Sequence, residues 1–229
     1  MKPSALILAS LLAGAGGRVL ADPPAPADPW CRNGAFPTDA ADFGLAKVTG
    51  APRTYLNDCV ENAPGCGDEE RRPYVVPGDV VITGKVSGAH VCVLMPNRVG
   101  GSAGWVRTAE ISPLPRAAPA PADWVGTWAE GDDSIRLTLR GTTLVVHGEA
   151  CWPSCHPSLA ERPGGPNIGE LDGAATPAGD TLAIADANTP PACTATLRLL
   201  GPYLLVTDNN QCGGMNVTFT GAYRRAGRR

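Results

Sequence analysis

Short apolar runs alternate with polar residues along most of the chain, and Gly, Pro, Asn or Asp interrupts them every few positions. A period of two with frequent turn residues is typical of β-strands joined by tight turns. In the first half the pattern predicts strands over residues 45–48, 74–76, 80–83 and 91–94. In the second half it predicts hairpins of residues 134–139 with 143–147 and 194–200 with 203–207, and a last strand over 216–220 and 222–224. No strong amphipathic helix interrupts this pattern, so the chain is expected to be all-β.

Two proline-rich stretches divide the chain. Residues 22–29 and residues 113–122 alternate Pro with Ala, a composition that favours an extended polyproline spacer over a strand. Four cysteines lie on either side of the second stretch, which indicates two separately cross-linked domains of ordinary size. The expected division is a signal peptide (1–21), an extended Pro-rich tail (22–42), a first barrel (43–112), a Pro/Ala linker (113–122), a second barrel (123–225) and a short tail (226–229).

The N-terminus has the pattern of a secretory signal. Lys2 precedes an apolar run over residues 5–13, and the small residues that follow end in Val19-Leu20-Ala21. Small side chains at these positions suit signal peptidase, and the apolar run is too short for a permanent membrane span. Cleavage would remove Lys2 and Arg18 and take the net charge from −3 to −5. A mildly acidic chain without a basic stripe is a poor candidate for binding nucleic acid.

The even number of cysteines behind this signal indicates disulfides formed in an oxidising compartment. The abundance of Ala, Gly, Pro and Arg, all with GC-rich codons, suggests a bacterial genome, so the expected location is the periplasm or the exterior. Cys59 and Cys66 flank a short loop and are expected to pair, which leaves Cys31 for Cys92, although four cysteines allow three pairings. In the second half, Cys193 and Cys212 come opposite each other beside the hairpin at Gly201-Pro202, and Cys151 then pairs with Cys155.

The segment Val76-Pro-Gly-Asp-Val-Val-Ile82, together with Gly104-Trp-Val106, resembles bacterial SH3-like domains. The resemblance implies a small five-stranded barrel over residues 43–112, with a short turn and a last strand near Ile111 and Leu114. It also implies a binding module that attaches to peptidoglycan or its stem peptides. The candidate ligand-binding residues are Tyr55, Tyr74 and Trp105, whose flat rings suit stacking on a peptide or sugar. Tyr55 lies in a turn-rich segment and is the better exposed candidate, whereas Trp105 is expected in the core rather than at a ligand, because its motif is structural.

The opening Gly126-Thr-Trp128 of the second half resembles the Gly-x-Trp of lipocalin-like barrels. The resemblance implies a barrel of about eight short strands in which Arg224 or Arg225, from the last strand, covers the ring of Trp128. The tract of residues 207–219 is also similar to a domain of uncharacterised secreted proteobacterial proteins. The shape carries no implied ligand, because fold does not determine function.

The sharpest chemical motif is Cys151-Trp-Pro-Ser-Cys155-His156. One residue more separates it from the C-x-x-C-H haem attachment pattern, and His147 and Met215 are available as second axial ligands. The same three residues could begin a zinc site, but no fourth ligand is evident. A plain disulfide beside a surface histidine is the simpler interpretation, so no metal and no cofactor is expected.

The chain contains three histidines, and none lies in a recognisable nucleophile motif. No catalytic residue is therefore expected. The leading hypothesis is a non-enzymatic secreted or periplasmic binding protein that recognises peptidoglycan or an envelope protein, without a stable membrane span after cleavage. Inhibition of a secreted hydrolase, a haem or metal protein using Cys151, Cys155 and His156, and an enzyme with unrecognised carboxylates remain as alternatives.

Overall fold

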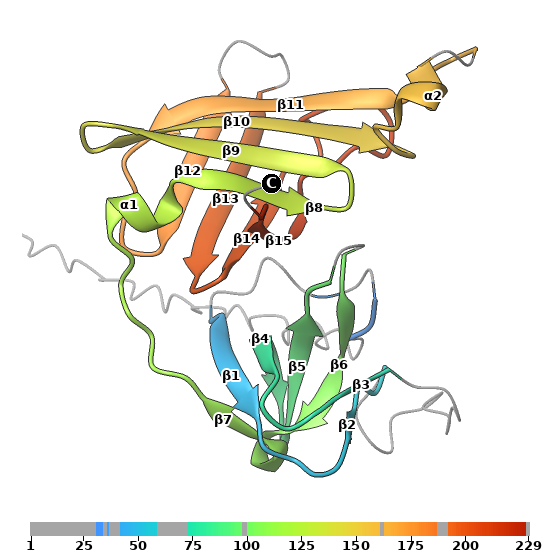
Figure 1. The fold of residues 1–229 in the computed structure, drawn as a ribbon, viewed down its shortest axis with the longest axis vertical. Coiled ribbons are helices and arrows are strands. Elements are labelled where there is room, and N and C mark those ends of the chain that lie inside the picture. Colours follow the sequence, from blue (N-terminus) through green and yellow to red (C-terminus); the bar gives the residue numbers. More distant parts are fainter. Residues whose placement is uncertain are drawn as a thin grey trace, which may run out of the picture.

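The computed structural model describes residues 31–33, 36, 42–58, 73–97, 100–160, 163–186 and 192–227. The expected signal peptide, most of the expected Pro-rich tail, and both Cys59 and Cys66 lie outside these residues. Within them the protein is all-β and consists of two parts stacked along its long axis (Figure 1). We call these parts the N-terminal unit (residues 31–113) and the C-terminal barrel (residues 121–225). Among the described residues, no helix is long and apolar enough to cross a membrane.

The N-terminal unit contains a five-stranded antiparallel sheet in the order β6-β5-β4-β1-β7. Its strands are β1 (Gly44–Val48), β4 (Val80–Ser87), β5 (His90–Met95), β6 (Ser102–Arg107) and β7 (Ile111–Pro113). The 3₁₀ turn η1 (Thr108–Glu110) separates β6 from β7. A two-stranded hairpin, β2 (Thr54–Tyr55) with β3 (Tyr74–Val75), lies in the long connection between β1 and β4.

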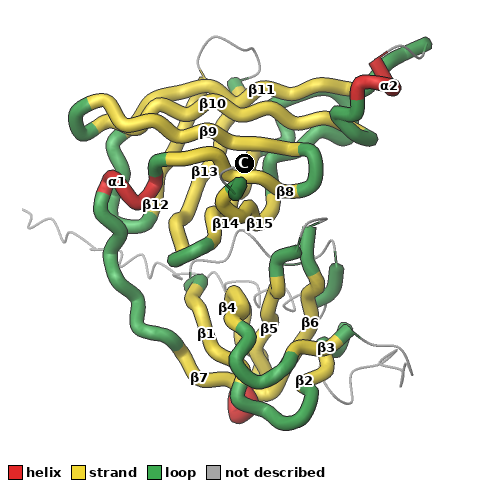
Figure 2. The backbone as a smooth tube through the Cα atoms, in the orientation of Figure 1, coloured by secondary structure: helices red, strands yellow, loops and turns green. Residues whose placement is uncertain are grey.

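The C-terminal barrel is a nearly closed antiparallel sheet of eight strands in the order β11-β10-β9-β8-β15-β14-β13-β12. Its strands are β8 (Gly126–Glu130), β9 (Asp133–Arg140), β10 (Thr143–Trp152), β11 (Asn167–Ala175), β12 (Thr181–Asp186), β13 (Cys193–Leu200), β14 (Tyr203–Asp208) and β15 (Gly221–Arg225). The first and last strands of this order, β11 and β12, come together where a Cβ on Gly173 would lie 2.5 Å from Ile184 Cγ2. Two four-residue helices, α1 (Pro121–Trp124) and α2 (Pro157–Ala160), lie outside the sheet (Figure 2).

Both predicted hairpins of the second half are present. Strands β9 and β10 pair around Gly141, and β13 and β14 pair around Gly201, with positive φ angles of 64° and 56° at the two glycines. Such turns need a residue that tolerates φ > 0, which is why glycine marks them in the sequence.

The predicted strand over residues 216–220 is wrong, since only residues 221–225 of this region join the sheet. The buried Asp208 explains the difference. Its carboxylate accepts hydrogen bonds from the Phe219 backbone N–H and from the hydroxyl groups of Thr218 and Thr220, each at 2.8 Å. Val217 and Phe219 therefore pack into the barrel core from an irregular segment whose hydrogen-bond donors bond to a side chain.

The C-terminal barrel fills its interior with its own large side chains. Trp124, Trp128, Phe219 and Tyr223 are almost completely buried among aliphatic residues from its strands. Trp128 Nε1 donates a 3.0 Å hydrogen bond to the Trp124 carbonyl, which satisfies a polar atom that burial would otherwise leave unpaired. The barrel thus has a complete core of its own.

The N-terminal unit buries both faces of its sheet. One face packs inside the unit against β1 and the β2–β3 hairpin, and its buried side chains are Ala46, Val48, Leu56, Val75, Val81, Val91, Val93 and Val106. The other face, with Ile82, Leu94 and Trp105, packs with Leu200, Tyr203, Leu205 and Ala222 of the barrel into one cluster. The Tyr203 hydroxyl also donates a 3.2 Å hydrogen bond to the Val80 carbonyl across this junction.

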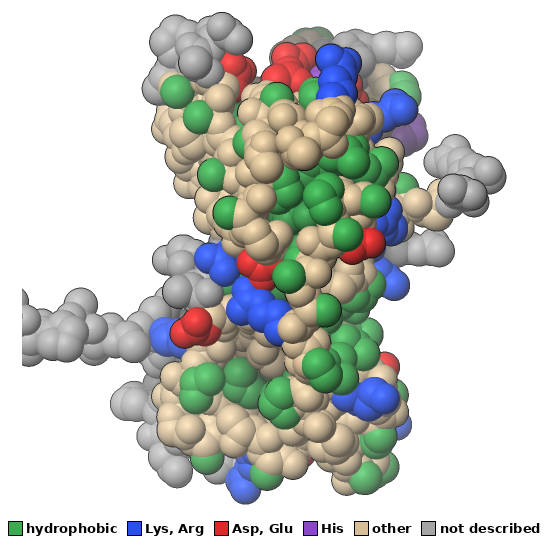
Figure 3. Space-filling view, turned by 90° about the vertical axis from the view of Figure 1, so that its left-hand side faces the viewer, with side chains coloured by type: hydrophobic (Ala, Val, Ile, Leu, Met, Phe, Trp, Pro, Cys, Tyr) green, Lys and Arg blue, Asp and Glu red, His purple; other side chains and the backbone are tan. Residues whose placement is uncertain are grey.

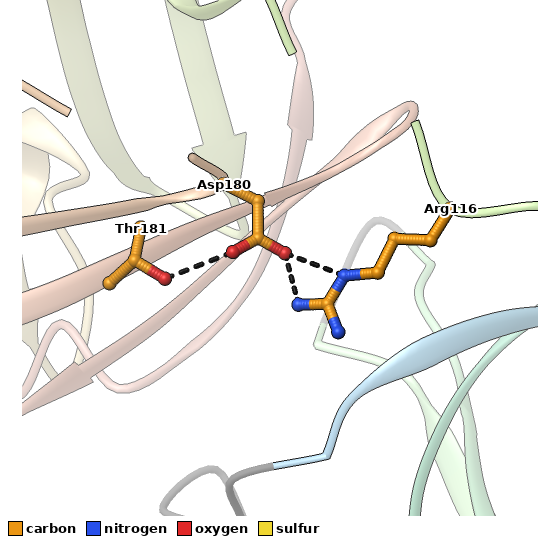
Figure 4. Close-up of polar contacts among 3 residues, drawn as sticks. All are labelled: Arg116, Asp180 and Thr181. Atoms are coloured by element: carbon orange, nitrogen blue, oxygen red, sulfur yellow. Dashed lines mark hydrogen bonds and ion pairs between the residues drawn. The ribbon is translucent and has the colours of Figure 1, made fainter. Parts of the chain in front are cut away.

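The chain between the two parts runs along one side of the molecule (Figure 1), and polar contacts attach its beginning to both parts. The Leu114 N–H donates to the Leu45 carbonyl at 2.8 Å. Arg116 forms an ion pair with Asp180, which also accepts from the Thr181 hydroxyl (Figure 4). Basic and acidic side chains gather at this waist on the face seen in Figure 3. The predicted Pro/Ala segment is largely exposed and runs outside the junction, while the two parts contact each other directly through their shared apolar cluster.

Candidate functional site

Two of the three predicted ligand-binding residues form an exposed aromatic pair. Tyr55 and Tyr74 are directly opposite on β2 and β3, with ring centroids 6.1 Å apart in an edge-to-face arrangement. Their side chains remain 49% and 46% exposed. The guanidinium group of Arg53 lies 4.4 Å above the Tyr74 ring, within the range of a cation–π contact. We call Arg53, Tyr55 and Tyr74 the tyrosine surface.

Backbone bonds hold the hairpin that carries this surface against the main sheet. Asn57 and Trp105 exchange N–H···O bonds of 3.1 and 2.6 Å, so the chain after β2 pairs with the edge strand β6. Leu56 is buried beneath, and a Cβ on Gly104 would lie 2.6 Å from the Leu56 Cβ. Glycine at position 104 thus allows the two backbones to approach. The tyrosine surface therefore stands on a fixed hairpin.

Trp105, the third predicted ligand-binding residue, is not part of the tyrosine surface. It is 1% exposed and lies in the cluster that joins the N-terminal unit to the barrel. A ring buried on all sides cannot stack on a ligand, so Trp105 is not a ligand-binding residue and takes the core position that its motif favours. The alternation of β6 explains its position, because Val106 faces the core of the unit and Trp105 faces the barrel.

Three of the four expected cysteine pairs are present as disulfides: Cys31–Cys92, Cys151–Cys155 and Cys193–Cys212. The fourth, Cys59–Cys66, lies outside the described residues. Cys31 is completely buried and Arg32 pairs with Gly104, so residues near the middle of the expected Pro-rich tail (22–42) are attached to the N-terminal unit and are not part of a free tail.

The motif at residues 151–156 forms a small disulfide loop at the end of β10. Cys151 and Cys155 are joined to each other, so neither sulfur is a thiolate ligand in this structure. Asp133 accepts the Cys151 N–H at 3.0 Å, and Asp132 accepts the Ser154 hydroxyl, which ties the loop to the β8–β9 turn. His156 Nδ1 lies 2.9 Å from the Ser158 hydroxyl. Among the described residues, no group of three or more His, Cys, Asp or Glu side chains is arranged to hold a metal ion.

His147, considered as a second axial ligand, lies on the outer face of β10. Its Nδ1 is 2.7 Å from Asp172 Oδ1 on the paired strand β11, and Nε2 is 3.6 Å from Glu149 Oε1. The hydrogen bond with Asp172 raises the pKa of His147, and Glu149 adds to this effect. Met215, the other axial candidate, is exposed in the loop after Cys212. His147 therefore takes part in polar contacts on the barrel surface, with Asp172 and Glu149 as its partners.

The contact expected between the last strand and the tryptophan of Gly126-Thr-Trp128 is present. The Arg225 guanidinium lies 4.6 Å from the centre of the Trp128 ring and donates hydrogen bonds to the Val125 and Asp123 carbonyls. A Cβ on Gly126, where φ is 146°, would lie 2.8 Å from this guanidinium. Arg225 therefore closes one end of the barrel, which is a structural role.

No family model, curated protein or solved structure matches the chain.

Sequence patterns did not indicate two residues of interest. Arg53 precedes β2 without any motif, and Glu130 belongs to β8 but lies in a cleft between the two parts. Neither position carries a signal in the sequence, because each depends on residues brought close only by folding.

Proposed function

We propose that the protein is a non-enzymatic secreted or periplasmic binding protein that recognises the cell wall through the tyrosine surface. The observation that carries this proposal is the exposure of two opposed tyrosine rings on a hairpin whose backbone is fixed to β6. Exposed aromatic clusters on a rigid base are unusual where no ligand covers them.

An SH3-like interpretation of the N-terminal unit supports the proposal. The strand order β6-β5-β4-β1-β7, with η1 before the last strand, agrees with the five-stranded barrel and closing turn that the resemblance implies. The β2–β3 hairpin then lies in the long loop between the first two strands of that barrel. The contact of Arg225 with Trp128 likewise supports a lipocalin-like interpretation of the C-terminal barrel.

The chemistry of the tyrosine surface suits a glycan with attached peptides. Each ring offers an apolar face for the C–H groups of a sugar and a hydroxyl for a hydrogen bond. Arg53 holds the Tyr74 ring and adds positive charge, which suits carboxylate groups. Three disulfides are compatible with the oxidising compartment in which such a ligand is found.

Co-sedimentation of the whole oxidised chain with peptidoglycan sacculi tests the proposal. The whole chain is used because the N-terminal unit buries one face against the barrel. The double variant Tyr55→Ala/Tyr74→Ala is expected to weaken binding at least about fivefold, because stacking on two rings is worth roughly 1–3 kcal/mol in total. Trp152→Ala is the matched control, since Trp152 is an equally exposed aromatic residue on the barrel, 46% accessible.

Unchanged binding by Trp152→Ala with a loss in the tyrosine variant supports recognition through this surface. Absence of binding by the unaltered chain, or an equal loss in both variants, contradicts it. In the former case an envelope protein becomes the partner to test next.

A further inference from the structure

A cleft of about 600 Å³ lies where the N-terminal unit meets the C-terminal barrel. A volume of this size accommodates a small organic molecule. The N-terminal unit supplies the β5–β6 connection, and the barrel supplies the ends of β8 and β15. The cleft is separate from the tyrosine surface, because none of the residues of that surface lines it.

The walls combine apolar and uncharged polar groups around a single ionisable side chain. Phe36, Leu94 and Ala222 give apolar surface, whereas Ser102 and Thr220 carry hydroxyl groups. Among the described residues that line the cleft, Glu130 alone carries a charge. A ligand with one charged end, a short apolar body and hydrogen-bonding groups matches this lining.

The carboxylate of Glu130 is fixed between the two parts of the molecule. A Cβ on Gly221 of the barrel would overlap Oε2, and a Cβ on Gly100 of the N-terminal unit would lie 3.5 Å from Oε1. Backbone from both parts therefore approaches the carboxylate, and glycine at each position leaves the space for it. This placement depends on the junction between the two parts.

Few interactions offset the loss of hydration at the Glu130 carboxylate. Desolvation raises the pKa of Glu130 to about 7, a hydrogen bond from the Ala222 backbone opposes the shift, and the nearby charge of Asp133 adds to it. No described Lys, Arg or His side chain is among the groups that act on it. A partly buried carboxylate in this position is stabilised in its ionised form by a cation that arrives with a ligand.

We propose that this cleft binds a small organic cation whose primary ammonium or guanidinium group pairs with Glu130. A metal ion is a poorer match, because the cleft offers one carboxylate and hard cations take six or more oxygen ligands. The aliphatic part of the cation would lie against Phe36 and Leu94, within reach of the hydroxyl groups of Ser102 and Thr220.

Binding should depend on pH, because only ionised Glu130 pairs with a cation. Asp133 from β9 and Tyr223 from β15 interact electrostatically with Glu130, and burial raises the pKa of both. A single carboxyl group that titrates near pH 7 makes the apparent affinity about tenfold weaker at pH 6 than at pH 8. The ammonium and guanidinium groups themselves stay charged over this range.

The probes are n-butylammonium and n-butylguanidinium, with n-butanol and butyrate as the neutral and anionic controls. Their binding to the whole chain is measured by NMR titration at pH 6 and pH 8. Glu130→Gln is expected to abolish binding of both cations. Glu149→Gln is the matched control, since it removes the same charge from an exposed side chain of β10.

Saturable binding of the cations alone, tighter at pH 8 and lost in Glu130→Gln but not in Glu149→Gln, is the expected result. Absence of binding at pH 8, equal binding of butyrate, or unchanged binding by Glu130→Gln overturns the proposal. If Glu130→Gln does not fold, the carboxyl ¹³C titration of the unaltered chain decides. The cation should lower the pKa of a Glu that titrates near 7, and an unchanged midpoint overturns the proposal.

Discussion

The two parts of the molecule solve the problem of burying their large side chains in different ways. The C-terminal barrel encloses Trp124, Trp128, Phe219 and Tyr223 within its own sheet. The N-terminal unit has an internal core made mainly of Val, and its largest buried residue, Trp105, faces the barrel. The barrel therefore holds its largest side chains in a core of its own, whereas the N-terminal unit places its largest one in the cluster that the two parts share.

The difference shows that a proline-rich boundary in sequence need not separate two independent structures. Small sheets bury a low fraction of their surface, so a second packed face contributes a large share of their stability. In this protein the outer face of β14 and β15 supplies that second layer. The same packing creates the cleft around Glu130, so stability and the proposed cation site share one junction.

The largest expected difference between the two parts concerns two buried tryptophans, one in each part. Removal of a fully buried Trp side chain costs about 3–5 kcal/mol. Trp105→Ala and Trp128→Ala should therefore lower the free energy of unfolding by similar amounts. Trp105→Ala should unfold the N-terminal unit and leave a folded barrel, whereas Trp128→Ala should unfold both. Two-dimensional NMR of each variant checks this, and loss of the barrel signals in Trp105→Ala would contradict the asymmetry.

The disulfides of the two parts close loops of very different length. Cys31–Cys92 spans 61 residues and Cys151–Cys155 spans 4. In the chain-entropy description the longer loop contributes about 4 kcal/mol and the shorter one about 2. Replacing each pair by Ala should therefore lower the free energy of unfolding more for the pair in the N-terminal unit. Chemical denaturation measures both, and the reverse order would be inconsistent with the dependence of that unit on external support.

Glu130→Gln tests the junction through its pH dependence. The folded-state pKa of Glu130 is raised from 4.5 to about 7, so the folded protein holds a proton that the unfolded chain has already released. Stability of the unaltered protein should thus fall as the pH rises from about 4.5 to about 7. At pH 8 Glu130→Gln should be more stable by up to about 3 kcal/mol, and at pH 4 nearly unchanged. Thermal unfolding at both pH values measures this, and equal effects at the two would refute the assignment.

The smallest effect is expected at the ion pair that attaches the connecting chain to the barrel. The Arg116 side chain is half exposed, and exposed ion pairs contribute about 0.2–1 kcal/mol. Arg116→Ala should lower stability by less than about 1 kcal/mol, and the difference should shrink at high salt. A larger loss in denaturant titrations would mean that the connecting chain, and not the apolar junction, holds the two parts together.

Local patterns in the sequence predicted much of the fold. The hairpins at Gly141 and Gly201, and the pairing of Cys193 with Cys212, follow from alternation and turn chemistry, which act over a few residues. Residues 216–220 have the same alternation, but three of them bond to Asp208, a partner ten or more positions away that alternation does not reveal.

The candidate sites were less accessible from sequence. The tyrosines at positions 55 and 74 were identified by residue type, but their pairing across a hairpin was not. The motif favoured a core position for Trp105 but did not show that the barrel covers it, because a period of two says which residues share a face and not what covers that face. Glu130 was missed because its environment comes from Gly100 and Gly221, which only the junction of the two parts brings close together.

The most direct test of the dependence of one part on the other is to produce residues 30–116 and residues 117–229 as separate oxidised fragments. Two-dimensional NMR and thermal unfolding report whether each fragment has a cooperative native state. We expect the barrel fragment to fold and the N-terminal fragment to lack fixed side-chain packing until the barrel is added. Cooperative folding of the N-terminal fragment alone, with the stability it has in the whole chain, would contradict the account.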